Sequence, residues 1–301
     1  MTTQIKSQSL TAFLTLLLIA FMMGTNHVAA RLAFNDGLDV ATAVATRSFT
    51  TAIAVSVMVI WGGLAWRVNR KQGRGLLLVG LLIGAQSQLL YGAVSRLPVA
   101  LALIAFNTFP LWTALWDFVI YKKRPDGAVL KALPILLLGL FLALDVLGAA
   151  SGLSASAHTA QIGVGVAFAV AAAAVFGLLL VVMQYETAGV DGRVRTAATL
   201  SLAGVVALAV IGAQGGPHWP QSSVGWYALA ALSILYGTAF TIMFTVLPKL
   251  GVGNNAAIMN AEPVFALIMA WLVLGQTIAA SQIAGALLVV GTVIWLGLRR
   301  R

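Results

Sequence analysis

The sequence predicts an all-α integral membrane protein with ten transmembrane helices. It arranges them as two five-helix repeats of inverted topology, with both termini in the cytoplasm. Three observations support this prediction: the composition, the sidedness of the basic residues and an internal repeat. The 301-residue chain is 60% hydrophobic and only 9% charged, with a mean hydropathy of +0.98. Soluble domains carry about 25% charged residues, so an ordinary globular domain is excluded.

Ten apolar stretches follow one another, each close to the roughly 20 residues that a helix needs to cross a bilayer. They lie near residues 10–33, 39–61, 75–94, 97–120, 130–150, 162–184, 195–213, 225–247, 253–274 and 279–298. The first could be mistaken for a signal peptide, because Lys6 precedes it. It is longer than a typical signal-peptide core and is followed by further spans, so we expect it to be retained.

The basic residues predict the orientation of these spans. The formal net charge is +10, which could suggest nucleic-acid binding. With the N-terminus inside, however, all of the 18 lysines and arginines except Arg31, Arg47 and Arg96 fall on one side. Short loops rich in Lys and Arg stay in the cytoplasm. The charge therefore indicates orientation in a lipid bilayer, and no nucleic-acid partner is expected.

The second half of the sequence repeats the first at a constant offset. Gly24 aligns with Gly177 in this register, and Asn107–Pro110 aligns with Asn260–Pro263. The repeats cover residues 1–150 and 161–301, joined by an expected periplasmic loop at 151–160. Five spans per repeat would insert the second half upside down, which is the plan of many secondary transporters.

The aligned motifs also predict a site near the bilayer midplane. Pro110 and Pro263 each remove one hydrogen bond from a spanning helix. In hydrocarbon, a freed carbonyl must find a partner or face a cavity. Asn107 and Asn260 recur beside these prolines, which favours a binding site over a pair of kinks filled by packing.

Glu262 is the deepest acidic residue of the predicted spans. A charge at the bilayer centre costs roughly 2.5–3.5 kcal/mol, so this carboxyl should be neutral, paired or facing water. It could bind a substrate amine or carry a proton. It could also be a protonated structural group that is hydrogen-bonded to a neighbouring helix.

Other polar residues of the spans have a structural and a functional interpretation. Arg47 could snorkel to the interface, pair with a substrate carboxylate, or pair with Asp145. His27 could be a packing residue or could contact cargo or protons. Asp117 is expected to pair with a loop lysine or arginine and could serve as an inner gate. Neutral hydrogen-bonding groups for the site are expected from Gln88, Tyr91 and Tyr236.

Several motifs together resemble a known family. They are Met23–Arg31, Arg47–Phe49, Tyr91–Pro98, Leu247–Gly251 and Glu262–Gly275. In order and spacing they resemble the drug/metabolite transporter superfamily, specifically its ten-span members with two EamA-type domains. The resemblance implies alternating access around a central cavity in the bacterial inner membrane. Among the varied cargoes of that family, we expect export of a small metabolite, and specifically of an amino acid.

The chain also departs from the family pattern. Gln276 stands where glutamate is usual, and His27 where an apolar or aromatic residue is usual. The first repeat lacks a clear Gly-Glu pair at Lys122 and Lys123.

Missing motifs limit the alternatives. The sequence contains no Walker A loop, no H-E-x-x-H, no G-x-S-x-G and no cysteine. We therefore expect no ATP hydrolysis, no catalytic residues, no metal and no cofactor. The remaining alternatives are a carrier or facilitator for a sugar, a nucleotide derivative or a drug, and a membrane-embedded lipid-modifying enzyme. Protons are a possible second partner, the direction of transport stays open, and one chain could form the pathway without an oligomer.

Overall fold

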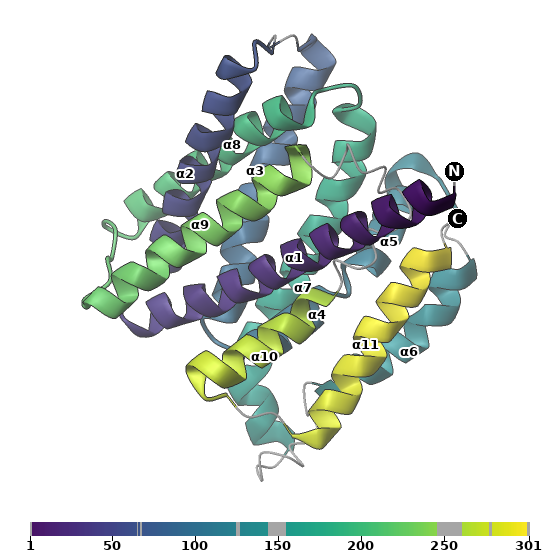
Figure 1. The fold of residues 1–301 in the computed structure, drawn as a ribbon. Coiled ribbons are helices and arrows are strands. Elements are labelled where there is room, and N and C mark those ends of the chain that lie inside the picture. Colours follow the sequence, from purple (N-terminus) through teal and green to yellow (C-terminus); the bar gives the residue numbers. More distant parts are fainter. Residues whose placement is uncertain are drawn as a thin grey trace.

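The computed structural model describes residues 2–64, 66, 68–124, 127–143, 155–245, 261–276 and 279–299, and every regular element in these ranges is helical (Figure 1). The helices are α1 (Thr2–Asn35), α2 (Val40–Trp61), α3 (Arg70–Val94), α4 (Val99–Phe106), α5 (Phe109–Tyr121), α6 (Gly127–Ala143), α7 (Ala155–Glu186), α8 (Gly192–Ala213), α9 (Ser223–Thr245), α10 (Glu262–Leu274) and α11 (Ala280–Arg299). Each predicted span overlaps at least one of these helices, and residues 144–150, 246–247 and 253–260 of the predicted spans lie outside the described residues.

Two differences from the predicted spans concern continuity. The fourth span is two helices, α4 and α5, that meet at Asn107 and Thr108. In addition, α7 begins at Ala155, so residues 155–160 are helical where a loop was expected. That segment is rich in alanine, which has the highest helix propensity of all residues.

Seven segments among the described residues are long and apolar enough to cross a membrane, with α4 and α5 counted as one. Shorter apolar stretches lie in α6, α10 and α11. Large apolar side chains cover the outside of the bundle, for example Ile53, Leu138, Trp271 and Leu287, each more than half exposed. Apolar surface on this scale is unfavourable in water and suits contact with lipid.

Local signals determine where several helices begin. The side chain of Asp39 accepts a hydrogen bond from the backbone N–H of Thr42 (2.8 Å) and so caps α2. Asn69 and Gln72 form a capping box at the start of α3, with bonds of 2.8 and 3.0 Å. Both caps satisfy backbone donors that the first turn of a helix leaves without partners.

The packing of the two repeats follows one pattern. The α1 helix packs between α9 and α10, as Figure 1 shows, and its counterpart α7 packs against α3 and α5. Counterparts also pack on each other in the pairs α2–α8 and α6–α11. Gly80 and Gly84 bring α3 close to α8, because a Cβ there would lie 2.6 Å from Leu202 and 2.8 Å from Val206. This glycine pair therefore serves helix packing.

Gly24 and Gly177 make the same close approach in the two repeats. A Cβ on Gly24 would lie 2.8 Å from the Glu262 carbonyl oxygen and 2.9 Å from the Ala266 nitrogen. A Cβ on Gly177 would lie 2.7 Å from the Thr113 nitrogen. These glycines therefore let α1 touch the start of α10, and α7 the start of α5.

The turns at opposite ends of the bundle also join the repeats. The Asp36 carboxylate accepts a hydrogen bond from the Ser222 N–H (2.8 Å), and the Asp39 carboxylate accepts one from the His218 N–H (2.7 Å). These bonds tie the α1–α2 turn to the α8–α9 turn.

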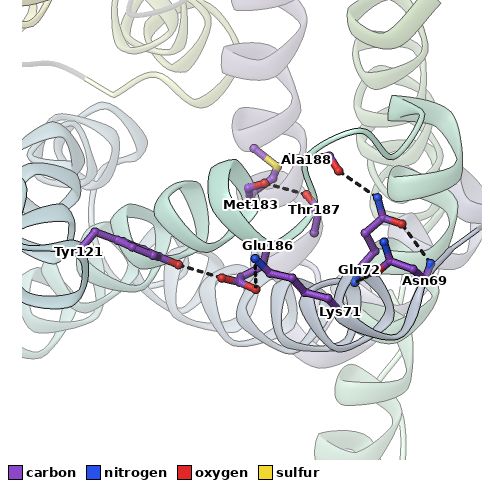
Figure 2. A network of polar contacts seen from close by, with 8 residues as sticks. All are labelled: Asn69, Lys71, Gln72, Tyr121, Met183, Glu186, Thr187 and Ala188. Carbon is purple, nitrogen blue, oxygen red and sulfur yellow. Dashed lines mark hydrogen bonds and ion pairs between the residues drawn. The ribbon is translucent and has the colours of Figure 1, made fainter.

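At the other end, the C-terminus of α7 meets α3 and α5 (Figure 2). The Glu186 carboxylate accepts a hydrogen bond from the Tyr121 hydroxyl (3.1 Å) and lies 3.6 Å from Lys71 Nζ. The Gln72 side chain donates to the Ala188 carbonyl (3.0 Å).

Candidate functional site

A buried polar cluster lies where α1, α2, α3, α9 and α10 meet. Its members are Asn26, His27, Arg47, Ser87, Tyr91, Tyr236 and Glu262. All of them except Glu262 are at most 4% exposed. The side chain of Glu262 is 22% exposed, which leaves its carboxyl group accessible.

His27 and Glu262 form the first half of this cluster. His27 Nε2 lies 3.1 Å from Glu262 Oε1, and His27 Nδ1 is buried without a hydrogen-bond partner among the described residues. Glu262 is the first residue of α10, with Pro263 following it in the first turn. Gly24, one helical turn before His27, allows the two helices to come this close. Of the three states expected for Glu262, namely neutral, paired or facing water, the structure shows a pairing contact with His27.

Arg47 forms the second half. Its guanidinium lies between two aromatic rings, with its central carbon 4.3 Å from the Tyr91 centroid and 4.1 Å from the Tyr236 centroid. Nη2 donates to the Ser87 hydroxyl (2.8 Å), while Nε is buried without a partner. The side chain is 3% exposed, so the expectation that it snorkels to the interface is wrong. Cation–π contacts on both faces partly replace the hydration that a snorkelling arginine keeps.

Tyr91 joins the two halves. Its hydroxyl donates to Asn26 Oδ1 (3.2 Å), and its ring meets the His27 ring at 5.6 Å and an angle of 82°. The same ring covers one face of Arg47. One tyrosine therefore contacts both a buried cation and the buried histidine that pairs with Glu262.

Comparison with known proteins accounts for this arrangement of helices. The model of the EamA-like transporter family matches the chain twice, over residues 10–144 and 163–298. The chain belongs to the EamA-like transporter family. It is therefore a transporter, and with its membrane-length apolar helices it is a multi-pass protein of the inner membrane.

Relatives and a solved structure are also similar. The threonine/homoserine exporter RhtA of Salmonella typhimurium LT2 is 26% identical over 72% of this chain and 70% of its own. RhtA of Escherichia coli K12 is 26% identical over 76% of this chain and 72% of its own. One crystal structure superposes with a TM-score of 0.60 at 22% identity, covering 95% of this chain and 98% of the other. That likeness supports the fold alone.

In this EamA-like transporter the prolines mark helix starts. Pro110 lies in the first turn of α5 and Pro263 in the first turn of α10. Asn107 is buried at the break between α4 and α5, and its backbone N–H donates to the Leu103 carbonyl (2.9 Å). Asn260 lies outside the described residues. Asp145, the other suggested partner of Arg47, also lies outside them.

The two helix starts differ in chemistry. Phe109, the counterpart of Glu262, packs against Phe106 and Phe176 with ring centroids 5.7 and 5.1 Å away. Of these two counterpart positions, only the one in the second repeat carries a carboxyl group.

Two further predicted residues make no hydrogen bond or ion pair with the cluster among the described residues. The Asp117 carboxylate pairs with Lys123 Nζ at 3.7 Å, which confirms the expected ion pair with a loop lysine. Its role as a gate stays a prediction. Gln88 lies on α3 beside Ser87, and its Nε2 is buried without a partner among the described residues.

Sequence reasoning missed Asn26 and Ser87. Ser87 precedes Tyr91 by four residues, so both lie on one face of α3, and Asn26 adjoins His27. The helical spacing from Tyr91 was a usable signal for Ser87. No comparable signal marked Asn26.

Proposed function

We propose that this EamA-like transporter exports small amino acids across the inner membrane by alternating access. In this proposal ten spans form two inverted repeats, with both termini in the cytoplasm. The main support is that ionisable groups of both kinds, basic and acidic, come together where the repeats meet. His27, Arg47 and Tyr91 come from the first repeat, and Tyr236 and Glu262 from the second. Charged groups inside a membrane bundle mark substrate and ion pathways.

Two lines of support favour an amino acid over other metabolites. The similar RhtA proteins are named threonine/homoserine exporters. In addition, a zwitterion carries an ammonium group, and the accessible Glu262 carboxylate is a suitable acceptor for it. Asn107, Asn260, Gln88 and the backbone freed at Pro110 and Pro263 would supply neutral hydrogen bonds.

Proton coupling is part of the proposal. A carboxylate that binds either a proton or the cargo's amine can exchange one for the other. His27 would take part, because its imidazole lies within contact of Glu262 and can exchange a proton with it. Export could then be driven by protons entering the cell.

The turns that join the repeats support a rocking movement. The Asp36 and Asp39 bonds cross between the repeats at one end of the bundle, and the Glu186 contacts cross at the other. In alternating access, the contacts at one end would break while those at the other end hold, and the reverse. Asp117 with Lys123 would act beside the second set as an inner gate.

Proteoliposomes test this function. Uptake of a labelled amino-acid panel that includes threonine and homoserine would be measured for the wild type, Glu262→Gln and Asp191→Asn. The control residue Asp191 caps α8 and contacts the neighbouring Arg193, away from the cluster, and asparagine also caps helices well. We expect saturable flux in the wild type and the control, and a loss of at least tenfold in Glu262→Gln.

Other outcomes would change the conclusion. If folded wild-type protein moves no member of the panel, the amino-acid assignment is wrong, and sugars, nucleotide derivatives and drugs are the next candidates. Flux that is independent of pH in both the wild type and Glu262→Gln would remove proton coupling. Equal flux in Glu262→Gln would give Glu262 a structural role.

A further inference from the structure

We propose that Arg47 is the anion subsite of the transport site and binds the carboxylate group of the cargo. This inference rests on the proposed function, since it assumes an amino acid as cargo. It goes further by assigning a residue to each charge of that cargo, so that Arg47 determines selection of zwitterions over simple amines.

The first argument is the geometry of the guanidinium. This group is planar and carries five N–H donors around its edge. The rings of Tyr91 and Tyr236 cover its two faces, at 4.3 and 4.1 Å. An acceptor can therefore approach only in the plane. Nη2 donates there to Ser87, whereas Nε is buried without a partner among the described residues.

The second argument is charge. In the part of the chain that the structure describes, no aspartate or glutamate forms an ion pair with Arg47. The nearby carboxylate, Glu262, contacts His27 instead. Burial of a cation is costly unless an anion pairs with it, and a carboxylate that binds in the guanidinium plane by two hydrogen bonds would match both its charge and its shape. A lysine at this position could not offer that geometry.

The third argument is the chain of contacts that leads from Arg47 to Glu262. The Tyr91 ring contacts both Arg47 and His27, and His27 contacts Glu262. A small amino acid with its carboxylate at Arg47 could therefore extend past Tyr91 and present its ammonium group to Glu262. In doing so it would replace His27 as the partner of that carboxylate. The cluster thus provides one group for each charge of a zwitterion.

The alternative is that Arg47 only holds α2, α3 and α9 together through Ser87 and the two rings. A structural arginine would affect all ligands equally. An anion subsite would affect only ligands that carry a carboxylate. The two roles are therefore separated by changing the protein and the ligand together.

The experiment is competition against a labelled amino acid that wild-type protein binds in detergent. The competitors are threonine and threonine amide, in which a carboxamide replaces the carboxylate. The variants are Arg47→Gln, Arg47→Lys and Arg96→Gln. Arg96 is the matched control because its guanidinium also lies over an aromatic ring, Phe168 at 4.7 Å, but it is exposed and lies outside the cluster.

We expect wild-type protein and Arg96→Gln to bind threonine at least tenfold more tightly than the amide. Arg47→Gln should weaken threonine binding at least tenfold and bind both ligands equally. Arg47→Lys should retain a reduced preference for threonine. Size-exclusion chromatography of each variant checks the fold, and if Arg47→Gln does not fold, the wild type and Arg47→Lys still decide.

Each contrary result has its own meaning. If wild-type protein binds both ligands equally, or if Arg47→Gln or Arg47→Lys keeps the full wild-type preference, the anion subsite is wrong although the amino-acid function stands. If folded wild-type protein binds no amino acid, the proposed function itself is wrong, and this assignment is overturned with it.

Discussion

The contact between His27 and Glu262 joins a histidine of α1 to the first residue of α10. The local sequence of neither helix requires this contact, because α1 and α10 would each form a helix without it. The contact therefore depends on how the two helices pack. Gly24 removes the Cβ that would otherwise separate the two helices at this level. This pair is thus held at the repeat interface, with His27 buried and the Glu262 side chain 22% exposed.

A first prediction concerns the proton sensitivity of this pair. His27→Gln should keep a hydrogen bond to Glu262 but cannot take up a proton. We expect its flux to remain within a few-fold of the wild type, while the dependence of flux on pH between 5 and 8 becomes flat. The measurement is amino-acid flux into proteoliposomes at a series of pH values. A wild-type pH profile in His27→Gln would show that the imidazole is not the titrating group.

A second prediction concerns Asp39 at the start of α2. Burial by itself would raise the pKa of this carboxyl, but hydrogen bonds from Thr42, Gln214 and His218 outweigh burial and lower the pKa below its usual value near 3.8. The ionised form therefore stabilises the folded protein above pH 4, and this stabilisation is lost as the pH falls through the lowered folded-state pKa. Asp39→Ala should lose about 1 kcal/mol at pH 7 through the missing cap.

Thermal unfolding in detergent at pH 7 and at pH values below 4 measures this effect. The wild type should lose more stability on acidification than Asp39→Ala, because the variant has already lost the contribution. Equal acid sensitivity in the two proteins would assign the loss to other carboxylates, such as Asp36, whose pKa is lowered chiefly by the backbone N–H of Ser222.

At the scale of elements, the counterpart helices α5 and α10 end in the same way with different residues. Both end in a left-handed residue: Lys122 with φ 56° after α5, and Gly275 with φ 64° after α10. Residues with a Cβ pay about 1–2 kcal/mol in this conformation, whereas glycine does not. The position after each cap also differs, since Lys123 pairs with Asp117 while the Gln276 side chain accepts from the Val99 N–H (3.2 Å).

A third prediction follows from these caps. Lys122→Gly should raise the free energy of unfolding by about 1 kcal/mol, and Gly275→Ala should lower it by a similar amount. Reversible unfolding in mixed micelles would measure both. The opposite sign for Lys122→Gly would mean that contacts of the lysine side chain outweigh the backbone strain.

The repeated glycines offer a fourth prediction with a built-in control. Gly24→Ala and Gly177→Ala place the same methyl group against a backbone 2.7–2.9 Å away, so each should lose about 1–3 kcal/mol of stability. Only Gly24→Ala moves α1 away from Glu262. We therefore expect a loss of amino-acid flux in Gly24→Ala that exceeds the loss in Gly177→Ala. Equal losses would show that flux depends on packing alone.

At the scale of the whole molecule, nearly symmetrical packing carries asymmetrical chemistry. Counterpart helices pack in matching pairs, yet Glu262 corresponds to Phe109, and His27 and Arg47 come from the first repeat alone. Two similar scaffolds thus enclose a site with distinct positive and negative groups. Such a site can orient an asymmetrical cargo, which a strictly symmetrical one could not do.

A fifth prediction tests the proposed orientation. The chain contains no cysteine, so single cysteines can report on the side of the membrane. Gln221→Cys, in the α8–α9 turn, should react with a membrane-impermeant maleimide in intact cells with a permeabilised outer membrane. Lys71→Cys, at the start of α3, should react only after lysis. Both residues are exposed, and the reverse pattern would invert the proposed topology.

The sequence alone predicted the apolar helices and the internal repeat, and it singled out Pro110 and Pro263, which lie in the first turns of α5 and α10. These properties depend on hydropathy and backbone chemistry within a few turns, which can be read locally. The tertiary structure alone decided that His27 meets Glu262 and that Arg47 lies between Tyr91 and Tyr236. Those contacts depend on which faces of distant helices meet, and close packing through residues such as Gly24 sets that choice.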